Sequence, residues 1–235
     1  MPNMVASMSI VFVAAESREF NGIISHVSNI SRLQWPLQFA KSAELGGRSV
    51  VLLANGPGPK LAAEAAEEAI RRLECVNGFV STGYCGALDN DLGTLDIVVA
   101  SKVNGDAALQ PATQQSYAAG PMLSQDSVAC TVEEKSRLRE TGAIAVEMEA
   151  AGVEKVARKI GVPFYCVRVV TDAASESLAL DFNRMRDADG RFSVARILAA
   201  ALRRPGQVFP ELFRLERTCR SASVALGDFI ANCRF

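Results

Sequence analysis

Short apolar runs alternate with amphipathic stretches along most of this 235-residue chain. The runs with the length of buried strands are Ser9–Ala15, Ser49–Ala54, Gly78–Thr82, Asp96–Val103 and Phe164–Val170. Leu61–Glu74 lies between the second and third runs and repeats small apolar residues at helical spacing. Strands that alternate with helices predict an α/β domain in which helices cover both faces of a mostly parallel sheet. Such sheets bind ligands beyond the carboxyl ends of their strands, so functional residues are expected there.

Composition excludes several classes of protein. The 25 basic and 26 acidic residues leave a net charge of −1, which argues against nucleic acid as a partner. No apolar run approaches the roughly 20 residues of a membrane-spanning helix, so we expect no integral membrane segment. Six cysteines without a C-x-x-C pair favour reduced thiols in the cytoplasm. A single histidine, His26, offers little to a Ser-His-Asp triad or a zinc site, and we expect no metal and no cofactor.

The chain is predicted to form one domain over residues 9–235, preceded by a flexible leader over residues 1–8. Further helices are predicted at Glu16–Val27, Val132–Arg139, Glu147–Ile160, Phe192–Arg203 and Glu211–Ile230. Asn104–Gln125 is polar and is expected to be a long loop. Arginines accumulate from about residue 184, so the last two helices are expected to form a basic C-terminal extension.

Several charged residues stand out against this pattern. Asp172 follows the last strand, where it could face a ligand or could simply form a turn or cap a helix. Glu149 lies on the apolar face of a predicted helix, where a carboxylate is costly without a partner. Arg168 interrupts an apolar strand and is the obvious structural partner, although Glu149 could also serve a ligand. Glu16 and Glu19 follow the first strand. Either could be a functional acid, or an exposed residue that stabilises the first turn of a helix.

These carboxylates follow different strands, and the chain has neither a P-loop nor a G-x-G-x-x-G motif. Such a set suits cleavage of a glycosidic bond. The transition state resembles an oxocarbenium ion, which carboxylates stabilise while they protonate the leaving group and activate water.

Four segments carry a resemblance to a known family. Val80–Leu88 and Leu95–Ser101 resemble the central strand-loop-strand of the nucleoside phosphorylase superfamily. Ala145–Ala151 resembles its ribose-binding Met-Glu motif, and Val167–Asp172 resembles its strand with the catalytic Asp. The resemblance extends over residues 9–174 and is strongest to 5′-methylthioadenosine/S-adenosylhomocysteine nucleosidases. The tail, with Asp181-Phe182-Asn183 and Arg204-Pro205-Gly206, is more similar to phosphorylase-like proteins associated with hopanoid synthesis.

The resemblance implies a single α/β domain with a mixed central sheet flanked by helices. It also implies a homo-oligomer, with a dimer favoured, that acts on a small purine nucleoside. Asp172 matches the general acid that protonates the purine at N7. Glu149 matches the carboxylate that binds the ribose 2′- and 3′-hydroxyls, and Met148 the residue that packs against the sugar. Glu19 matches the residue that activates water in nucleosidases, with Glu16 as a rival.

The base side of the site shows departures from the family pattern. Val128 and Ala129 match the segment that holds the base, but Val128 replaces an aromatic residue. Ser81 and Tyr84 stand where many phosphorylases carry Arg and Ser for phosphate, which favours hydrolysis. Tyr84 also replaces a small residue of the nucleosidases. The turn that Tyr84 forms with Cys85 and Gly86 could let a ligand approach the backbone, or could simply join two elements.

Two alternatives to a nucleosidase stay open at this point. One is a phosphorylase, including a hopanoid-linked one, that would hold phosphate with other residues such as Arg18. The other is a nucleoside-binding protein of the same fold without catalysis. Cleavage that depends on phosphate would identify a phosphorylase. Nucleoside binding without turnover would identify the non-catalytic protein.

Overall fold

The computed structural model describes residues 9–187, 189–203 and 205–235, so the expected leader over residues 1–8 lies outside the described residues. The strands are β1 (Ser9–Ala14), β2 (Val27–Arg32), β3 (Phe39–Leu45), β4 (Arg48–Ala54), β5 (Val76–Ala87), β6 (Ile97–Val103), β7 (Asp106–Ala107), β8 (Ala118–Ser124), β9 (Ala145–Glu147) and β10 (Phe164–Asp172). They form one sheet in the order β10-β6-β8-β9-β5-β1-β4-β3-β2, in which β7 pairs with β6 and β10 also pairs with β5.

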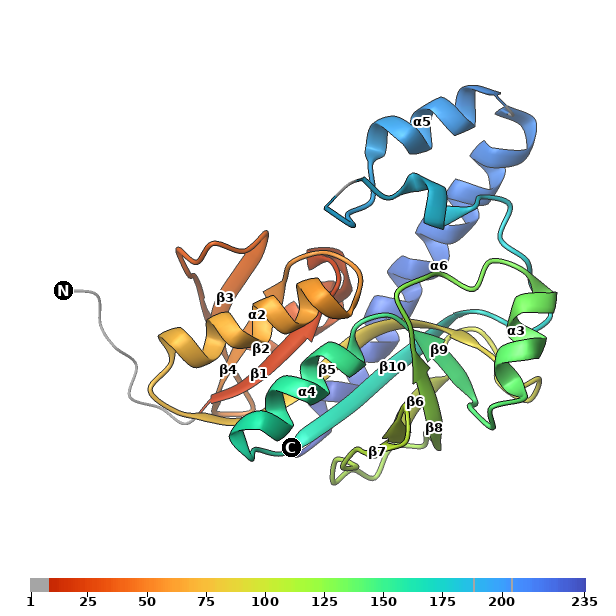
Figure 1. Ribbon diagram of the computed structural model, residues 1–235. Coiled ribbons are helices and arrows are strands. Elements are labelled where there is room, and N and C mark those ends of the chain that lie inside the picture. The colour runs from red at the N-terminus through yellow and green to blue at the C-terminus, as the bar shows by residue number, and fades with distance from the viewer. Residues whose placement is uncertain (1–8, 188, 204) are drawn as a thin grey trace.

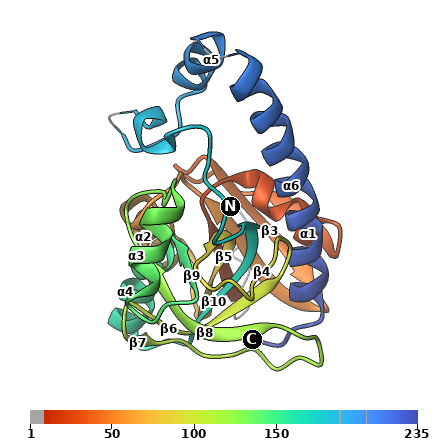
Figure 2. The ribbon, with the colours of Figure 1, turned by 90° about the vertical axis from the view of Figure 1, so that its right-hand side faces the viewer.

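The helices cover both faces of this sheet. They are η1 (Ser17–Phe20), α1 (Asn21–Ile24), α2 (Pro59–Arg72), α3 (Val132–Arg139), α4 (Ala150–Ile160), η2 (Phe182–Met185), α5 (Val194–Arg203) and α6 (Pro205–Ala231). Figure 2 shows α2 and α4 on one side of the sheet and α6 with α1 on the other. Gly22 and Gly227 let α1 and α6 approach closely, because a Cβ on either glycine would overlap the opposite backbone. No described helix is long and apolar enough to cross a bilayer.

Three parallel strands bring the expected site residues to one edge of the sheet. β1 and β10 each pair in parallel with β5. Asp172 lies opposite Gly86 at the carboxyl ends of β10 and β5. η1 with Glu19 follows directly after β1, whose carboxyl end lies at the same edge. β6 and β9 pair antiparallel with β10 and β5, so the sheet is mixed and the predicted fold class is confirmed.

The predicted loop over Asn104–Gln125 is wrong. This segment contains β7 and β8, and β8 lies inside the sheet between β6 and β9. Its glycine and proline suggested a loop, but Gly120 leaves room for the Ile144 side chain, which a Cβ there would approach to 2.7 Å. The Asn104 side-chain amide also bonds the backbone of Ser124 in both directions, at 2.8 and 2.9 Å, and fixes the end of the strand.

Two helix predictions need correction at their ends. Helical structure after β1 stops at Ile24, and Val27 already begins β2. The helix predicted from Glu147 begins only at Ala150, because Glu147 ends β9. Its carboxylate accepts hydrogen bonds from the backbone N–H groups of Glu149 and Ala150, so it caps the helix from outside.

The two C-terminal helices are present, but the break between them is shorter than expected. α5 ends at Arg203, and α6 begins at Pro205, six residues before the predicted start at Glu211. Proline is well suited to a first helical position because it has no N–H to leave unpaired. α5 and the first part of α6 stand beyond the layered body of the molecule (Figure 1).

Candidate active site

A cavity of about 560 Å³ lies at the carboxyl ends of β1, β5 and β10. It contains nearly all of the candidate residues that the sequence indicated. Those in its lining are Glu16, Arg18, Glu19, Tyr84, Cys85, Gly86, Val128, Ala129, Met148, Glu149 and Asp172. Arg168 is absent from the lining and lies beneath it. Among the described residues, no group of three or more His, Cys, Asp or Glu side chains could hold a metal ion.

Arg168 is a fully buried cation on β10, with 0% of its surface exposed. Its guanidinium donates to Thr82 O and Ser81 Oγ, both at 2.7 Å. It also pairs closely with Glu147 and, at 3.3 Å, with Glu149 Oε2. Burial lowers the pKa of Arg168, but the two carboxylates more than offset this and raise it above its usual value. The predicted Arg168–Glu149 pair is therefore present, as the weaker of two.

Glu147 is a site residue that the sequence analysis missed. It was assigned to a helix, where it would be an ordinary charged residue. In the fold its carboxylate is buried between the start of α4 and Arg168. One signal in the sequence could have found it. Glu147 and Glu149 flank Met148, so either carboxylate could have been the partner of the buried Arg168.

Glu149 lies just before α4, and it is buried where it lines the cavity. Oε1 accepts a hydrogen bond from Gly58 N at 3.1 Å, where Gly58 precedes α2 with a φ of +104°. Burial raises the pKa of Glu149 to about 8, although Arg168 acts in the opposite direction. Because Glu147 makes the closer contact with Arg168, the effect of burial on Glu149 prevails.

Glu19 is held in place by backbone groups. Its carboxylate accepts from Glu16 N at 2.8 Å and from Tyr84 N at 3.2 Å. Gly83 makes this approach possible, because its φ is +130° and a Cβ there would lie 2.5 Å from Glu19 Oε1. Burial raises the pKa of Glu19. The hydrogen bond from Glu16 N and the charge of Arg168 act in the opposite direction but do not offset this effect. Of the two acids after β1, Glu19 is buried and Glu16 is half-buried.

Asp172 is bound at both carboxylate oxygens. Lys135 Nζ lies 2.6 Å from Oδ2, and the Thr171 hydroxyl donates to Oδ1 at 2.9 Å. Gly86 leaves room for it, because a Cβ there would lie 2.9 Å from Oδ2. Lys135 was also not identified from the sequence, since its helix, VEEKSRLR, has five charged residues among eight. Nothing local distinguishes the one lysine that the fold buries.

The residues considered for phosphate are engaged elsewhere. Ser81 accepts from Arg168, and the Tyr84 hydroxyl donates to Cys219 O at 2.9 Å. Arg18 pairs with Glu16 at 2.7 Å and contacts Glu216 at 3.8 Å. Burial raises the pKa of Tyr84 and that of the Cys85 thiol, which keeps both groups protonated near neutral pH.

The segment expected to hold the base is tied to the C-terminal extension. Asn183, in η2, accepts from Val128 N at 2.8 Å and donates to Val128 O at 2.9 Å. These two bonds use both backbone groups of Val128. Ala129 follows and lines the cavity. The sequence analysis named Asn183 only as part of the tail and assigned it no role at the site.

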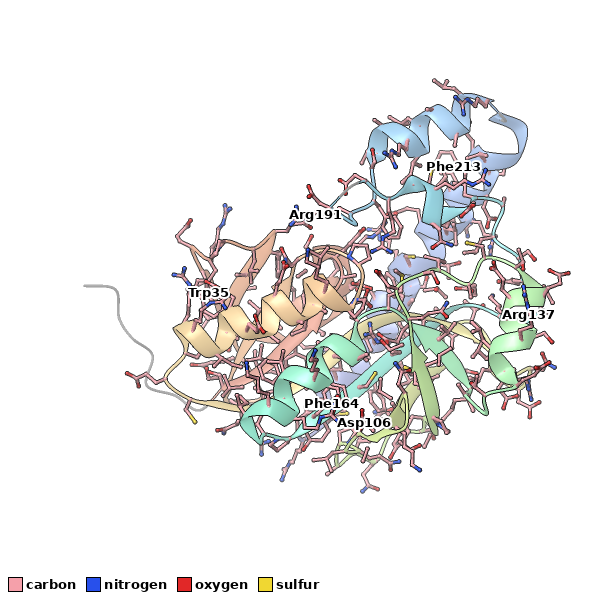
Figure 3. The ribbon with its side chains drawn as sticks, in the orientation of Figure 1. Trp35, Asp106, Arg137, Phe164, Arg191 and Phe213 are labelled. Carbon is pink, nitrogen blue, oxygen red and sulfur yellow. The ribbon has the colours of Figure 1, made fainter. Side chains whose placement is uncertain are left out.

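The extension supplies an apolar end to the cavity. Its apolar lining residues are Phe192, Ile197, Phe209, Leu212, Phe213 and Leu215, and Phe182 lies just before it. It also contributes Glu216 and Cys219. Phe213 lies on the part of α6 that stands away from the sheet (Figure 3). Arg191 lies where the extension approaches the end of β4, and its side chain donates to Asn55 O and Oδ1, both at 3.4 Å (Figure 3). The cavity is therefore polar at the sheet and apolar beneath the extension.

Comparison with known proteins places this arrangement in a family. A model of the phosphorylase superfamily matches residues 9–125 and 116–203. A 5′-methylthioadenosine/S-adenosylhomocysteine nucleosidase from Shewanella piezotolerans is 27% identical over 192 residues, 67% of this chain and 83% of the relative. One from Chromohalobacter salexigens is 25% identical over 207 residues, 74% of this chain and 88% of the relative.

A solved structure has the same fold. The S-adenosylhomocysteine nucleosidase of Streptococcus pyogenes, in complex with 5-methylthiotubericidin, superimposes with a TM-score of 0.71 at 16% identity. The match covers 98% of this chain and 97% of that one. A mixed sheet with a carboxylate-lined cavity at one edge thus defines an α/β protein with a pocket at the carboxyl ends of its parallel strands. The chain belongs to the phosphorylase superfamily, which confirms the resemblance drawn from its motifs.

Proposed function

We propose that this protein is an N-ribosyl hydrolase that cleaves the N-glycosidic bond of a purine nucleoside. The substrate would resemble 5′-methylthioadenosine or S-adenosylhomocysteine, which the relatives named above carry in their names. One observation carries the proposal: Glu19, Glu149 and Asp172 come from three different segments and line one cavity. Glycosidic cleavage needs carboxylates around the sugar for its cationic transition state.

Glu149 and Met148 are proposed to bind the ribose. A carboxylate can accept hydrogen bonds from two adjacent hydroxyls, and those bonds favour its ionised form. Met148 lines the cavity beside Glu149, where a thioether can pack against the apolar face of a sugar. Arg168 supports this site from below through its contact with Glu149.

Asp172 is proposed to protonate the purine at N7, with Val128 and Ala129 holding the base. As the bond between C1′ and N9 breaks, its electron pair passes to the purine, which takes the Asp172 proton at N7. Tyr84, Cys85 and Gly86 complete this wall of the cavity.

Glu19 is proposed to accept the proton of the attacking water. The water oxygen bonds to C1′, and its proton passes to the Glu19 carboxylate. A base works best when its pKa lies near the working pH, and burial shifts the pKa of Glu19 in that direction. Phosphate suits the site poorly, because Glu16 already pairs with Arg18 and buried carboxylates would repel a dianion.

The deciding experiment is a product analysis with 5′-methylthioadenosine. The hydrolase releases adenine and a free methylthioribose at a rate indifferent to added phosphate. Accumulation of a ribose 1-phosphate, abolished by Arg18→Ala, would identify a phosphorylase. Tight nucleoside binding without any adenine release would identify a non-catalytic binding protein.

The apolar end of the cavity favours a nucleoside with an extended apolar 5′-substituent. We propose that the extension from about residue 184 provides this end, since it contributes Phe192, Ile197, Phe209, Leu212, Phe213 and Leu215 to the lining. The sugar would face the carboxylates, with its 5′-carbon directed toward Phe182 and Phe192. These rings pack edge to face with centroids 5.9 Å apart.

The protein is further proposed to be a cytoplasmic homodimer. All six cysteines are free thiols, which suits a reducing compartment. Val194, Leu198 and Leu202 form an exposed apolar row along α5, and such a row suits contact with another subunit. Sedimentation velocity measures the assembly, and a monomer at micromolar concentration would contradict the dimer.

A further inference from the structure

Lys135 is the least exposed of the charged residues on α3, with 1% of its surface accessible. Its ammonium has three close acceptors. Nζ lies 2.6 Å from Asp172 Oδ2, 2.7 Å from Ala173 O and 2.9 Å from Glu176 O. A lysine ammonium carries three N–H donors, so this set of acceptors uses all of them. The geometry therefore fits the charged form of Lys135 and fixes its direction.

This contact determines the setting of Asp172. Thr171 holds Oδ1 and Lys135 holds Oδ2, so the carboxylate cannot rotate without losing a hydrogen bond. Lys135 also binds the two carbonyls of the turn that follows β10, which fixes the backbone beside the acid. Helix α3 thus reaches the catalytic edge of the sheet through one side chain.

We propose that Lys135 is a positioning residue for proton transfer by Asp172. The inference rests on the proposed function, in which the Asp172 proton moves to N7 while the bond between C1′ and N9 breaks. The carboxyl first takes up a proton from solvent, and it changes from neutral to negative when that proton moves to N7, while Lys135 keeps its three protons throughout. A fixed ammonium interacts more strongly with the carboxylate than with the neutral acid, so it stabilises the state in which the proton has left.

A purely structural role makes a different prediction. If Lys135 only secured the turn over residues 173–176, its loss would slow every reaction at this site equally. If it acts through Asp172, its loss matters only where the leaving group needs a proton. 4-Nitrophenyl β-D-ribofuranoside provides the comparison, because nitrophenolate departs without protonation.

The experiment compares wild type, Lys135→Met, Asp172→Asn and the double variant on both substrates. We expect Lys135→Met to lower kcat for 5′-methylthioadenosine by roughly 10- to 100-fold, less than the roughly 10²–10⁴-fold that a general acid itself contributes. The rate with the nitrophenyl riboside should stay close to that of wild type. In the Asp172→Asn background, Lys135→Met should cost nothing further, because residues that act as one unit are not additive.

Equal losses on the two substrates, or an added loss in the double variant, would overturn the inference. Lys155→Met, at an exposed position of α4, is the matched control and should behave as wild type. If Lys135→Met does not fold, the double variant still decides, since it removes both charges of the pair and is compared with Asp172→Asn alone. Failure of wild type to release adenine would instead contradict the proposed function.

Discussion

Arg168 organises the charges beneath the cavity. It stands among apolar neighbours on β10 and bonds Glu147, Glu149 and the backbone of β5 at once. A buried cation without these partners would be costly, and so would either carboxylate without the cation. Each Glu149 oxygen has one partner, Gly58 N on Oε1 and Arg168 on Oε2, and can accept a further hydrogen bond from a ligand.

Glu149 provides a pH-dependent prediction. Its pKa of about 8 in the free protein keeps it mostly protonated at pH 7. Hydroxyl donors from ribose favour the ionised form, so nucleoside binding should expel this proton. Calorimetry at pH 7 in buffers of different ionisation enthalpy should register release of about one proton.

The release should shrink as the pH rises above 8, because the free protein is then already ionised. Glu149→Gln carries no proton to lose and should abolish the release. An unchanged release in that variant would assign the proton to another group, with Glu19 the next candidate.

The pair Glu19 and Glu16 provides a second prediction. Glu19→Gln should lower kcat by about 10²–10⁴-fold, because an amide cannot accept the proton of water. Glu16→Gln should cost less than about 10-fold, since the Glu16 carboxylate is already paired with Arg18. Steady-state adenine release measures both variants, which are matched in charge and chemistry. A larger loss from Glu16→Gln would exchange the two roles.

At the residue scale, the sequence could indicate charged residues that follow an apolar run or interrupt an apolar pattern. Glu19, Glu149 and Asp172 were reachable, because each stands near the end of an apolar run or on an apolar face. Lys135 was not, since its burial depends on α3 meeting the turn after β10, a contact between segments far apart in sequence. Glu147 was missed because the strand β9 is only three residues long.

At the scale of elements, hydrophobic periodicity located the central strands and most of the helices. α3 has the predicted bounds, and β10 extends two residues beyond its predicted end. β2 was missed because its side chains are mostly exposed, so it lacks an apolar run. β8 was missed because Gly120 and Pro121 resemble a turn. In the fold, Gly120 instead leaves space for the Ile144 side chain.

The contact between η2 and Val128, which is proposed to hold the base, provides a third prediction. Asn183→Ala removes two hydrogen bonds to Val128, each of which contributes about 1 kcal/mol. We expect KM for 5′-methylthioadenosine to rise about 10-fold, with kcat nearly unchanged, because the base site is loosened and the acids are untouched.

Asn183→Asp is the sharper variant, because it keeps the acceptor and places an oxygen against Val128 O. It should be at least as damaging as Asn183→Ala. Asn90→Ala, at an exposed position outside the cavity lining, is the control. A normal KM in both Asn183 variants would show that the base does not depend on this contact.

At the scale of the whole molecule, the cavity has two sources. Asp172 at the end of β10, Glu19 in η1 and Glu149 just before α4 supply the carboxylates. The C-terminal extension supplies the apolar end. Arg186 fastens the extension to the sheet side through Asp126 Oδ1 at 2.8 Å and Asp126 O at 3.0 Å. Arg191 adds its bonds to Asn55. The arginines read in the sequence as a basic tail therefore include two that fix the extension over the site.

The two-part cavity leads to the last prediction, on the 5′-substituent. Wild type should prefer 5′-alkylthioadenosines with longer chains, with kcat/KM rising by roughly 2- to 4-fold per CH₂ buried until the apolar end is full. Phe192→Ala removes part of that wall, so the gain per CH₂ should become smaller while cleavage of adenosine itself changes little. Val224→Ala, on the exposed side of α6 and outside the cavity lining, should keep the slope of wild type. If kcat/KM instead falls with chain length in wild type, the 5′-carbon points away from the extension, and the apolar end has another purpose.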